Sequence, residues 1–407
     1  MTHILPEAFR AKITVDANRY GRSDRSAMGR WFWEIDRVLL LLIAVLIGIG
    51  LIAVAAASPA AGARLSGGNV HFADLYYFYR QIAWIGIGVP VMIAISMMPK
   101  DRARRLSLFG AGIFLVLLIF VPIIGPQVNG ARRWINIGVG QLQPSEFLKP
   151  FYVVSMAWLL SLRESDKSLP VFALSVLPVG VVAYLLMKQP DFGSTIIFVA
   201  VWIAMLALAG LSLRMLGILG VAGLAGIVLA YFFYDVATQR INEFLFNAGD
   251  NFQVENAMRT LTAGGLFGVG PGAGTHKFGL PEPHTDYIFS VVGEEFGLIA
   301  CLAIALLYLT IVARVLVKLL DEDSPFTILA AAGLVIQFGL QALINMLVNV
   351  QLAPSKGMTL PFISYGGSSM LALSIGMGLL LAFTRRNPYL TRSPYAVKWS
   401  GESEALT

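Results

Sequence analysis

One carboxylate in this sequence stands where a polar loop meets the start of a long apolar stretch. Asp286 ends the polar run 280–286, and apolar residues follow it almost without interruption. Ionisable groups at membrane depth are costly and are functional candidates by default. An acid at such a boundary can meet the polar head of an amphiphile while the tail stays in the bilayer. The structural alternative is a helix N-cap, a common place for Asp, and the two roles are compatible.

Two further carboxylates follow on the same stretch. Glu294 and Glu295 lie eight and nine residues beyond Asp286, which is about 12–13 Å deeper along a helix. At that depth they need a cation, a partner Lys or Arg, water or a shared proton. His284 is close enough to Asp286 in sequence to tune it, or it is simply a loop residue.

A stripe of amides marks a later apolar stretch. Its members, spaced four residues apart, are Gln337, Gln341, Asn345 and Asn349. This spacing places all four on one helical face over about 18 Å. The stripe predicts either interhelical hydrogen bonds or the polar lining of a groove that reaches into the bilayer. Elsewhere, Glu146 and Lys149 lie one turn apart at a span entrance, which predicts an intrahelical ion pair.

Cations in the predicted outer loops have the chemistry to clamp phosphate oxygens. They include Arg132, Arg133, Lys277 and Lys356. The glycine-rich run 268–274 does not predict a nucleotide site, because it follows a polar loop and precedes another span instead of lying in a βαβ unit. The four histidines lack metal-ligand spacing, and one cysteine excludes a disulfide framework.

The elements that must position these residues are membrane helices. Of the 407 residues, 57% are hydrophobic and only 13% are charged, against roughly 25% charged in soluble domains. Apolar stretches of about 20 residues predict an all-α integral membrane protein, a bundle of about ten transmembrane helices. They cover residues 38–57, 80–98, 106–124, 147–162, 170–187, 194–210, 215–234, 287–313, 326–348 and 366–383. A large extracytoplasmic loop, about 235–285, precedes the eighth.

Basic residues set the orientation. With the N-terminus inside, inner segments hold 20 Lys and Arg residues and outer segments hold eight, and this bias favours the cytoplasm. Residues 1–37 are therefore predicted to be a cytoplasmic segment, 38–386 the ten-helix domain and 387–407 a cytoplasmic tail, with Asp286 facing outward. The net charge of +6 fits attraction to anionic membrane lipid, and no compact basic domain exists for nucleic acid.

Five sequence blocks resemble, in order, the SEDS family of membrane proteins (shape, elongation, division and sporulation). They are residues 129–135, 143–146, 189–195, 284–297 and 354–369. The resemblance covers nearly all of 38–386, and the last block, KGMTLPFISYGGSS, is most similar to the division members. Elongation members usually differ just before its proline and after its second glycine.

The resemblance implies an enzyme that polymerises lipid II, an undecaprenyl-pyrophosphate-linked disaccharide peptide, at the outer face of the inner membrane. The family's essential aspartate corresponds to Asp286, which we expect to act as general base in septal wall synthesis. Candidate pyrophosphate or sugar contacts are Arg132, Arg133, Lys277, His284, Lys356 and Ser368. Residues expected to have structural or tuning roles are Glu146, Lys149, Asp191, Glu294, Glu295, Gln341 and Asn345.

The same resemblance implies a partner and leaves alternatives open. The expected partner is a class B penicillin-binding protein, a single-span transpeptidase, beside other membrane proteins of the division machinery. No cofactor is expected beyond a divalent cation, Mg or Mn. The alternatives are an elongation-type polymerase, a scaffold that only recruits division proteins, or a lipid II flippase that uses Glu294, Glu295 and the amide stripe. A flippase is disfavoured because no inverted repeat is visible.

Overall fold

The computed structural model describes residues 27–66, 72–127, 131–138, 140–246, 252–354 and 357–385. The chain divides into two compact units. The smaller unit comprises residues 1–37 and 385–407. In its described part, α2 (Ala27–Glu34) is followed by Arg37, whose guanidinium lies over the rings of Phe32 and Trp33 at 4.3 and 4.4 Å.

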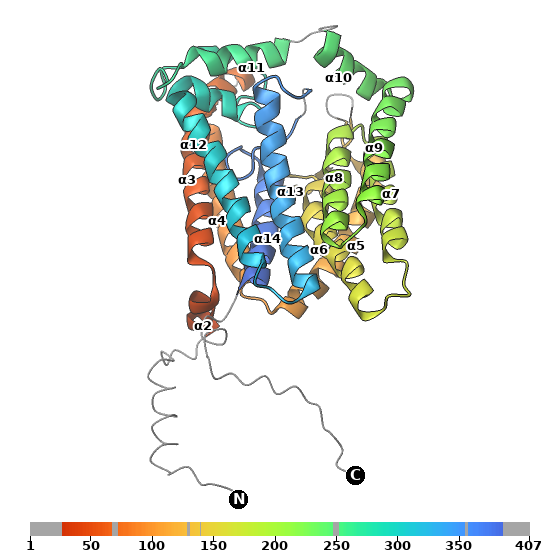
Figure 1. Ribbon diagram of the computed structural model, residues 1–407. Coiled ribbons are helices and arrows are strands. Elements are labelled where there is room, and N and C mark those ends of the chain that lie inside the picture. The colour runs from red at the N-terminus through yellow and green to blue at the C-terminus, as the bar shows by residue number, and fades with distance from the viewer. Residues whose placement is uncertain are drawn as a thin grey trace, which may run out of the picture. The chain divides into compact units, whose positions relative to one another are not determined.

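The larger unit, Val38–Thr384, is a bundle of helices that run side by side (Figure 1). Each of the ten predicted stretches is helical. These helices are α3 (Arg37–Leu65), α4 (Tyr76–Ser96), α5 (Lys100–Ile124), α6 (Pro144–Ser165), α7 (Val171–Lys188), α8 (Phe192–Leu208), α9 (Leu213–Phe233), α12 (Ile288–Leu319), α13 (Pro325–Asn349) and α14 (Gly367–Thr384).

The all-α membrane fold is confirmed. Within the described residues, eight helices are long and apolar enough to cross a membrane, namely α3, α4, α5, α7, α9, α12, α13 and α14. Of the other two, α8 is a shorter apolar helix, and α6 carries charged residues at both ends. A total of ten spans therefore stays a prediction.

The centre of the bundle is formed by α6, α13 and α14. Helix α13 packs against α6, α8, α12 and α14, and α14 packs against α4, α6 and α13. At the periphery, α9 has no buried residue, as expected of a helix whose side chains face lipid. In α13 and α14, by contrast, 67% of the apolar window is buried, so the amide stripe of α13 lies in one of the most enclosed helices.

The polar segment before α12 is more ordered than a loop. It contains two amphipathic helices, α10 (Asp235–Phe246) and α11 (Phe252–Ala263), and the 3₁₀ turn η1 (His276–Gly279). Both helices lie across one end of the bundle (Figure 1). Helix α11 packs on α12 and η1 and buries Ala257 against Leu280 and Tyr287. A short hairpin, β1 (Ile135–Asn136) and β2 (Gln141–Leu142), precedes α6.

Candidate active site

Asp286 lies in the turn before α12, and its backbone is held from two sides. The amide of Tyr287 donates to the carbonyl of Glu282 at 3.3 Å, which closes the turn. The Asp286 carbonyl accepts Asn345 Nδ2 at 2.9 Å and Asn349 Nδ2 at 3.1 Å. The N-cap of α12 is Tyr287, without a side-chain cap hydrogen bond. The N-cap role considered for Asp286 is therefore wrong, and its carboxylate does not cap the helix.

A second segment, 357–366 between α13 and α14, packs on this turn. Ser364 Oγ donates to the carbonyl of Thr285 at 2.5 Å. The backbone of Gly357 comes so close to Asp286 that a Cβ there would lie 3.0 Å from Oδ2. Such contact is tighter than ordinary van der Waals distance, so glycine lets this backbone approach the carboxylate.

The environment of Asp286 raises its proton affinity. Burial raises the pKa of Asp286 from 3.8 to about 7, and the negative charge of Glu282 acts in the same direction. The charges of Arg240 and Arg133 lower this pKa and so oppose the rise. The side chain nevertheless keeps part of its surface exposed. Asp286 is thus a reachable carboxyl group that can take up or release a proton near neutral pH.

His284 is a buried aromatic neighbour of this turn. Its ring centroid lies 3.9 Å from that of Tyr77 and 5.4 Å from that of Tyr365. Burial lowers the pKa of His284 to about 4, so the ring is neutral at physiological pH. Its Nδ1 is buried and has no hydrogen-bond partner among the described residues. The geometry places His284 as a wall of the site.

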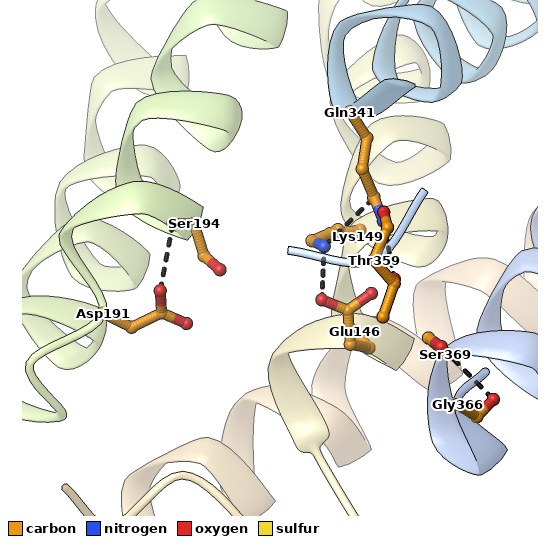
Figure 2. A network of polar contacts seen from close by, with 8 residues as sticks. All are labelled: Glu146, Lys149, Asp191, Ser194, Gln341, Thr359, Gly366 and Ser369. Atoms are coloured by element: carbon orange, nitrogen blue, oxygen red, sulfur yellow. Dashed lines mark hydrogen bonds and ion pairs between the residues drawn. The ribbon is translucent and has the colours of Figure 1, made fainter. Parts of the chain in front are cut away.

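The amide stripe of α13 joins three segments (Figure 2). Lys149 Nζ donates to Glu146 Oε1 at 2.5 Å and to Gln341 Oε1 at 3.2 Å. Gln341 Nε2 donates in turn to the carbonyl of Thr359 at 3.2 Å. The predicted Glu146–Lys149 ion pair is present. The contact between Gln341 and Lys149 joins α13 to α6 and fits the expected interhelical hydrogen bonding. Other amides of the stripe bind carbonyls of the loops around Asp286.

Two other residues selected from the sequence, Asp191 and Ser368, each form a hydrogen bond within the bundle. Asp191 is the N-cap of α8 and accepts the amide of Ser194 at 3.1 Å (Figure 2). Ser368, at the start of α14, donates to the carbonyl of Gln141 at 3.1 Å. Asp191 is therefore placed in a structural role, and Ser368 ties α14 to the hairpin before α6.

The predicted cations separate into different environments. Arg132 is exposed, and its Nη1 donates to the carbonyl of Pro122 at 3.1 Å. Arg133 is half-buried, and its Nε donates to the carbonyl of Gln189 at 3.2 Å. Lys356 lies outside the described residues.

Lys277 requires a correction. Its side chain is only 1% exposed and forms an ion pair with Glu295. An ammonium that is enclosed and paired in this way is not available to a pyrophosphate, so the contact predicted for Lys277 is wrong. The sequence left open whether a cation, a Lys or Arg, water or a shared proton balances the Glu295 carboxylate. The structure shows that its partner is Lys277.

Sequence reasoning did not select Arg240 of α10. It counted this residue only as a charge in an outer loop, although the Arg240 charge lowers the pKa of Asp286. The two residues are 46 positions apart in the sequence, so no helical or strand periodicity connects them. Only the folded position of α10 brings their charges together. The described residues also bring no three His, Cys, Asp or Glu side chains together in a metal-binding group.

The fold and this site define a multi-pass membrane protein with a titratable carboxylate at one end of its bundle. A family model described as a cell cycle protein, FtsW/RodA/SpoVE, matches residues 37–389. The chain therefore belongs to the FtsW/RodA/SpoVE family.

Relatives and solved structures agree with this membership. The chain is 38% identical over 372 residues to a probable peptidoglycan glycosyltransferase FtsW of Caulobacter vibrioides, covering 91% of this chain and 94% of the relative. A Coxiella burnetii protein of the same name is 34% identical over 369 residues, covering 87% and 98%. A chain of a peptidoglycan synthase complex matches with a TM-score of 0.70 at 25% identity, covering 86% and 97%. Thermus thermophilus rod shape determining protein RodA matches with a TM-score of 0.63 at 26% identity, covering 86% and 96%.

Proposed function

We propose that this chain is a peptidoglycan glycosyltransferase that polymerises lipid II at the outer face of the inner membrane during septal wall synthesis. The observation that carries the proposal is the Asp286 carboxyl, partly exposed at the end of a membrane bundle, with a pKa raised to about 7. The names of the relatives support the activity and the division role. The orientation with both termini in the cytoplasm rests on the distribution of basic residues.

In this proposal Asp286 is the general base. It takes the proton from the sugar 4-hydroxyl of one lipid II molecule while that oxygen attacks the anomeric carbon of the growing chain. The bond from this carbon to the pyrophosphate oxygen breaks, and undecaprenyl pyrophosphate leaves with the bonding electrons. A positioned base of this kind contributes roughly 10²–10⁴-fold to the rate, and a pKa near the working pH suits it.

The departing pyrophosphate needs positive charge. Arg133 and Arg240 supply it in this proposal, because their charges already reach Asp286. Arg133 uses part of its guanidinium on the carbonyls of Gln189 and Pro190, and a guanidinium has five N–H donors in all. Arg132 is exposed and uses Nη1 on the carbonyl of Pro122, so its other N–H donors are proposed to meet the substrate. His284 and Ser368 remain candidate sugar contacts. A divalent cation, Mg or Mn, is proposed only as one that arrives with the anionic substrate.

The partner proposed here is a class B penicillin-binding protein that cross-links the new strand, together with other membrane proteins of the division machinery. A structural neighbour comes from work on the coordination of polymerisation and crosslinking by a peptidoglycan synthase complex, which supports a transpeptidase partner. The similarity to elongation protein RodA keeps an elongation role as the alternative.

A flippase has less support. Its internal path would use Glu294, Glu295 and the amide stripe, yet both carboxylates and most of the amides are occupied. The Glu294 carboxylate accepts two backbone amides, Glu295 pairs with Lys277, and Asn345 binds two carbonyls. Side chains committed to holding the fold are poorly suited to carry a moving polar head group.

The test is polymerisation of labelled lipid II by the purified protein with its cognate transpeptidase and a divalent cation. We expect Asp286→Asn to lower the rate roughly 10²–10⁴-fold, because it removes the base but keeps the size of the side chain. Asp166→Asn is the matched control, since Asp166 is exposed between α6 and α7. Equal polymer from wild type and Asp286→Asn would exclude Asp286 as the base. Loss of lipid II translocation in vesicles when Glu294 or Glu295 is replaced, with translocation retained in Asp286→Asn, would favour the flippase.

A further inference from the structure

The helical backbone of α12 is interrupted at Gly297, and a segment that precedes the helix in the sequence supplies hydrogen bonds at the interruption. Gly297 has a φ of +81°, outside the helical region. The carbonyls of Glu294 and Glu295 accept the amides of Val269 and Gly270 at 2.9 and 3.1 Å. Beyond the break, the amides of Leu298 and Ile299 donate to the carbonyls of Gly265 and Leu266 at 3.0 and 3.3 Å. Residues 264–270, which we call the splint, thus replace hydrogen bonds that the helix loses.

The splint requires glycine because backbone meets backbone. A Cβ on Gly264 would lie 2.0 Å from the carbonyl oxygen of Gly293, and one on Gly268 would lie 2.2 Å from that of Glu295. Gly297 is equally close to the carbonyl of Leu266, at 2.3 Å. Gly268 begins the glycine-rich run 268–274, and close backbone packing accounts for a glycine at this position without a nucleotide, since only glycine permits such approach.

Side chains lock the segment that follows the splint. The Glu294 carboxylate accepts the amides of His276 and Lys277 at 2.7 and 2.9 Å. The Glu295 carboxylate accepts the amide of Gly272 at 3.1 Å and pairs with the Lys277 ammonium. Lys277 Nζ also donates to the carbonyl of Ala56 on α3 at 2.8 Å. One buried ammonium therefore joins α3, α12 and the polar segment.

This lock lies directly upstream of Asp286. Lys277 belongs to η1, and the next residue after η1 is Leu280, fully buried in a core cluster with Tyr287 and Val291. The chain from Lys277 to Asp286 is therefore short and fixed at both ends. Outside the lock, the upstream end is held by apolar contacts, by the splint and by hydrogen bonds that Arg64 and Asn256 donate to the carbonyl of Gly279 at 3.1 and 3.4 Å.

We propose that Lys277 is a positioning residue that fixes the turn carrying Asp286 through its ion pair with Glu295 and its hydrogen bond to Ala56. The consequence for turnover rests on the proposed glycosyltransferase function. The expected effect on the mobility of residues 272–287 does not depend on that function, because it concerns only how firmly this segment is held. Removing Lys277 leaves a buried carboxylate without its cation, which is costly, and the segment must rearrange to hydrate it.

The experiment uses the full-length protein in detergent and compares Lys277→Met with Lys167→Met, an exposed lysine between α6 and α7. Hydrogen exchange by mass spectrometry follows peptides within 272–287. We expect exchange there to be roughly tenfold faster in Lys277→Met only, with α6 and α13 unchanged. In lipid II polymerisation we expect kcat to fall roughly 10²-fold, with KM within about twofold.

A double variant separates positioning from stability. Lys277→Met with Glu295→Gln removes both charges and still offers an acceptor to Gly272, so we expect the melting temperature to recover. The ties to Ala56 and to the cation stay lost, so fast exchange and low kcat should persist. Recovery of kcat along with stability would overturn the positioning role. If Lys277→Met does not fold, Glu295→Gln alone is measured against Glu164→Gln, with the same expectations.

Two further outcomes would each decide a separate point. Unchanged exchange across 272–287 in a folded Lys277→Met protein would overturn the lock. Faster exchange with unchanged kcat would overturn its role in catalysis. If wild type makes no polymer at all, the proposed function fails, and the exchange data alone then uphold or reject the fixing of the loop.

Discussion

The ionisation of Asp286, which the charge of Glu282 influences, predicts a measurable pH dependence of the polymerisation rate. The pKa of Asp286 is raised to about 7, and the charge of Glu282 contributes to the rise. A base works only when deprotonated, so the polymerisation rate should increase with pH and level off above about 7. Glu282→Gln removes a negative charge and lowers the pKa of Asp286, which should move this rise to lower pH by roughly half a pH unit. The measurement is kcat/KM against pH for both proteins.

The control for this prediction is Glu164→Gln, which removes an exposed carboxylate at the far end of α6. Its profile should coincide with that of wild type. A Glu282→Gln profile that shifts toward higher pH, or does not shift, would contradict the electrostatic account of Asp286.

At this scale the sequence was informative about positions and about a partner within one helix, but not about partners on distant segments. It identified Asp286 from a polar run beside an apolar stretch, and it identified the Glu146–Lys149 pair from helical spacing. It assigned Lys277 to the substrate, because an isolated lysine in a loop gives no sign that Glu295, 18 residues later, will enclose it. It missed Arg240, whose effect on Asp286 depends on the placement of α10.

At the scale of elements, the amide stripe of α13 positions the loops. Asn345 Nδ2 donates to the carbonyls of Asp286 and Met358 at 2.9 and 2.6 Å. Asn345→Leu removes the Asn345 donor from the carbonyl of Met358 and leaves the carbonyl of Asp286 with Asn349 Nδ2 alone. An unsatisfied buried group costs about 1–3 kcal/mol. We expect a lower melting temperature and a kcat reduced at least roughly tenfold. The measurements are thermal unfolding in detergent and lipid II polymerisation.

Gln337→Leu provides a matched comparison within the same stripe. Gln337 is buried and lies on the same face of α13, but its Oε1 has no hydrogen-bond partner among the described residues. It lines an open pocket beside Leu334, Phe338 and Leu380, an apolar lining that a leucine side chain suits. The substitution should cost less than Asn345→Leu in both measurements. Equal losses would mean that the stripe acts through general packing.

The elements themselves were predictable to different degrees. Hydropathy located every long helix, because a membrane span needs an unbroken apolar stretch. It did not reveal α10 and α11, which are too polar to be detected as spans. The break in α12 was also hidden, since Gly297 lies within a stretch predicted as one span. Its positive φ is stable because residues 264–270 supply the missing hydrogen bonds.

At the scale of the whole molecule, the alternation of helices sorts the charges by end. One end of the bundle holds the start of α5, residues 100–105, and the end of α6 with the loop that follows it, residues 163–169 (Figure 1). The segment from α10 to Asp286 lies at the other end. The first end is rich in Arg and Lys, as cytoplasmic loops are. A polymerase that acts on lipid II at the outer face of the membrane requires Asp286 at the opposite, outer end.

Cysteine labelling tests this orientation. The one native cysteine, Cys301, is buried, so introduced cysteines can be labelled over a low background. Phe278→Cys replaces a side chain that is 46% exposed beside the site, and Ser168→Cys lies in the exposed loop after α6. In spheroplasts, an impermeant maleimide should label Phe278→Cys directly and Ser168→Cys only after permeabilisation. The opposite pattern would place Asp286 in the cytoplasm, where a carboxylate at this end of the bundle cannot polymerise an outward-facing lipid-linked sugar.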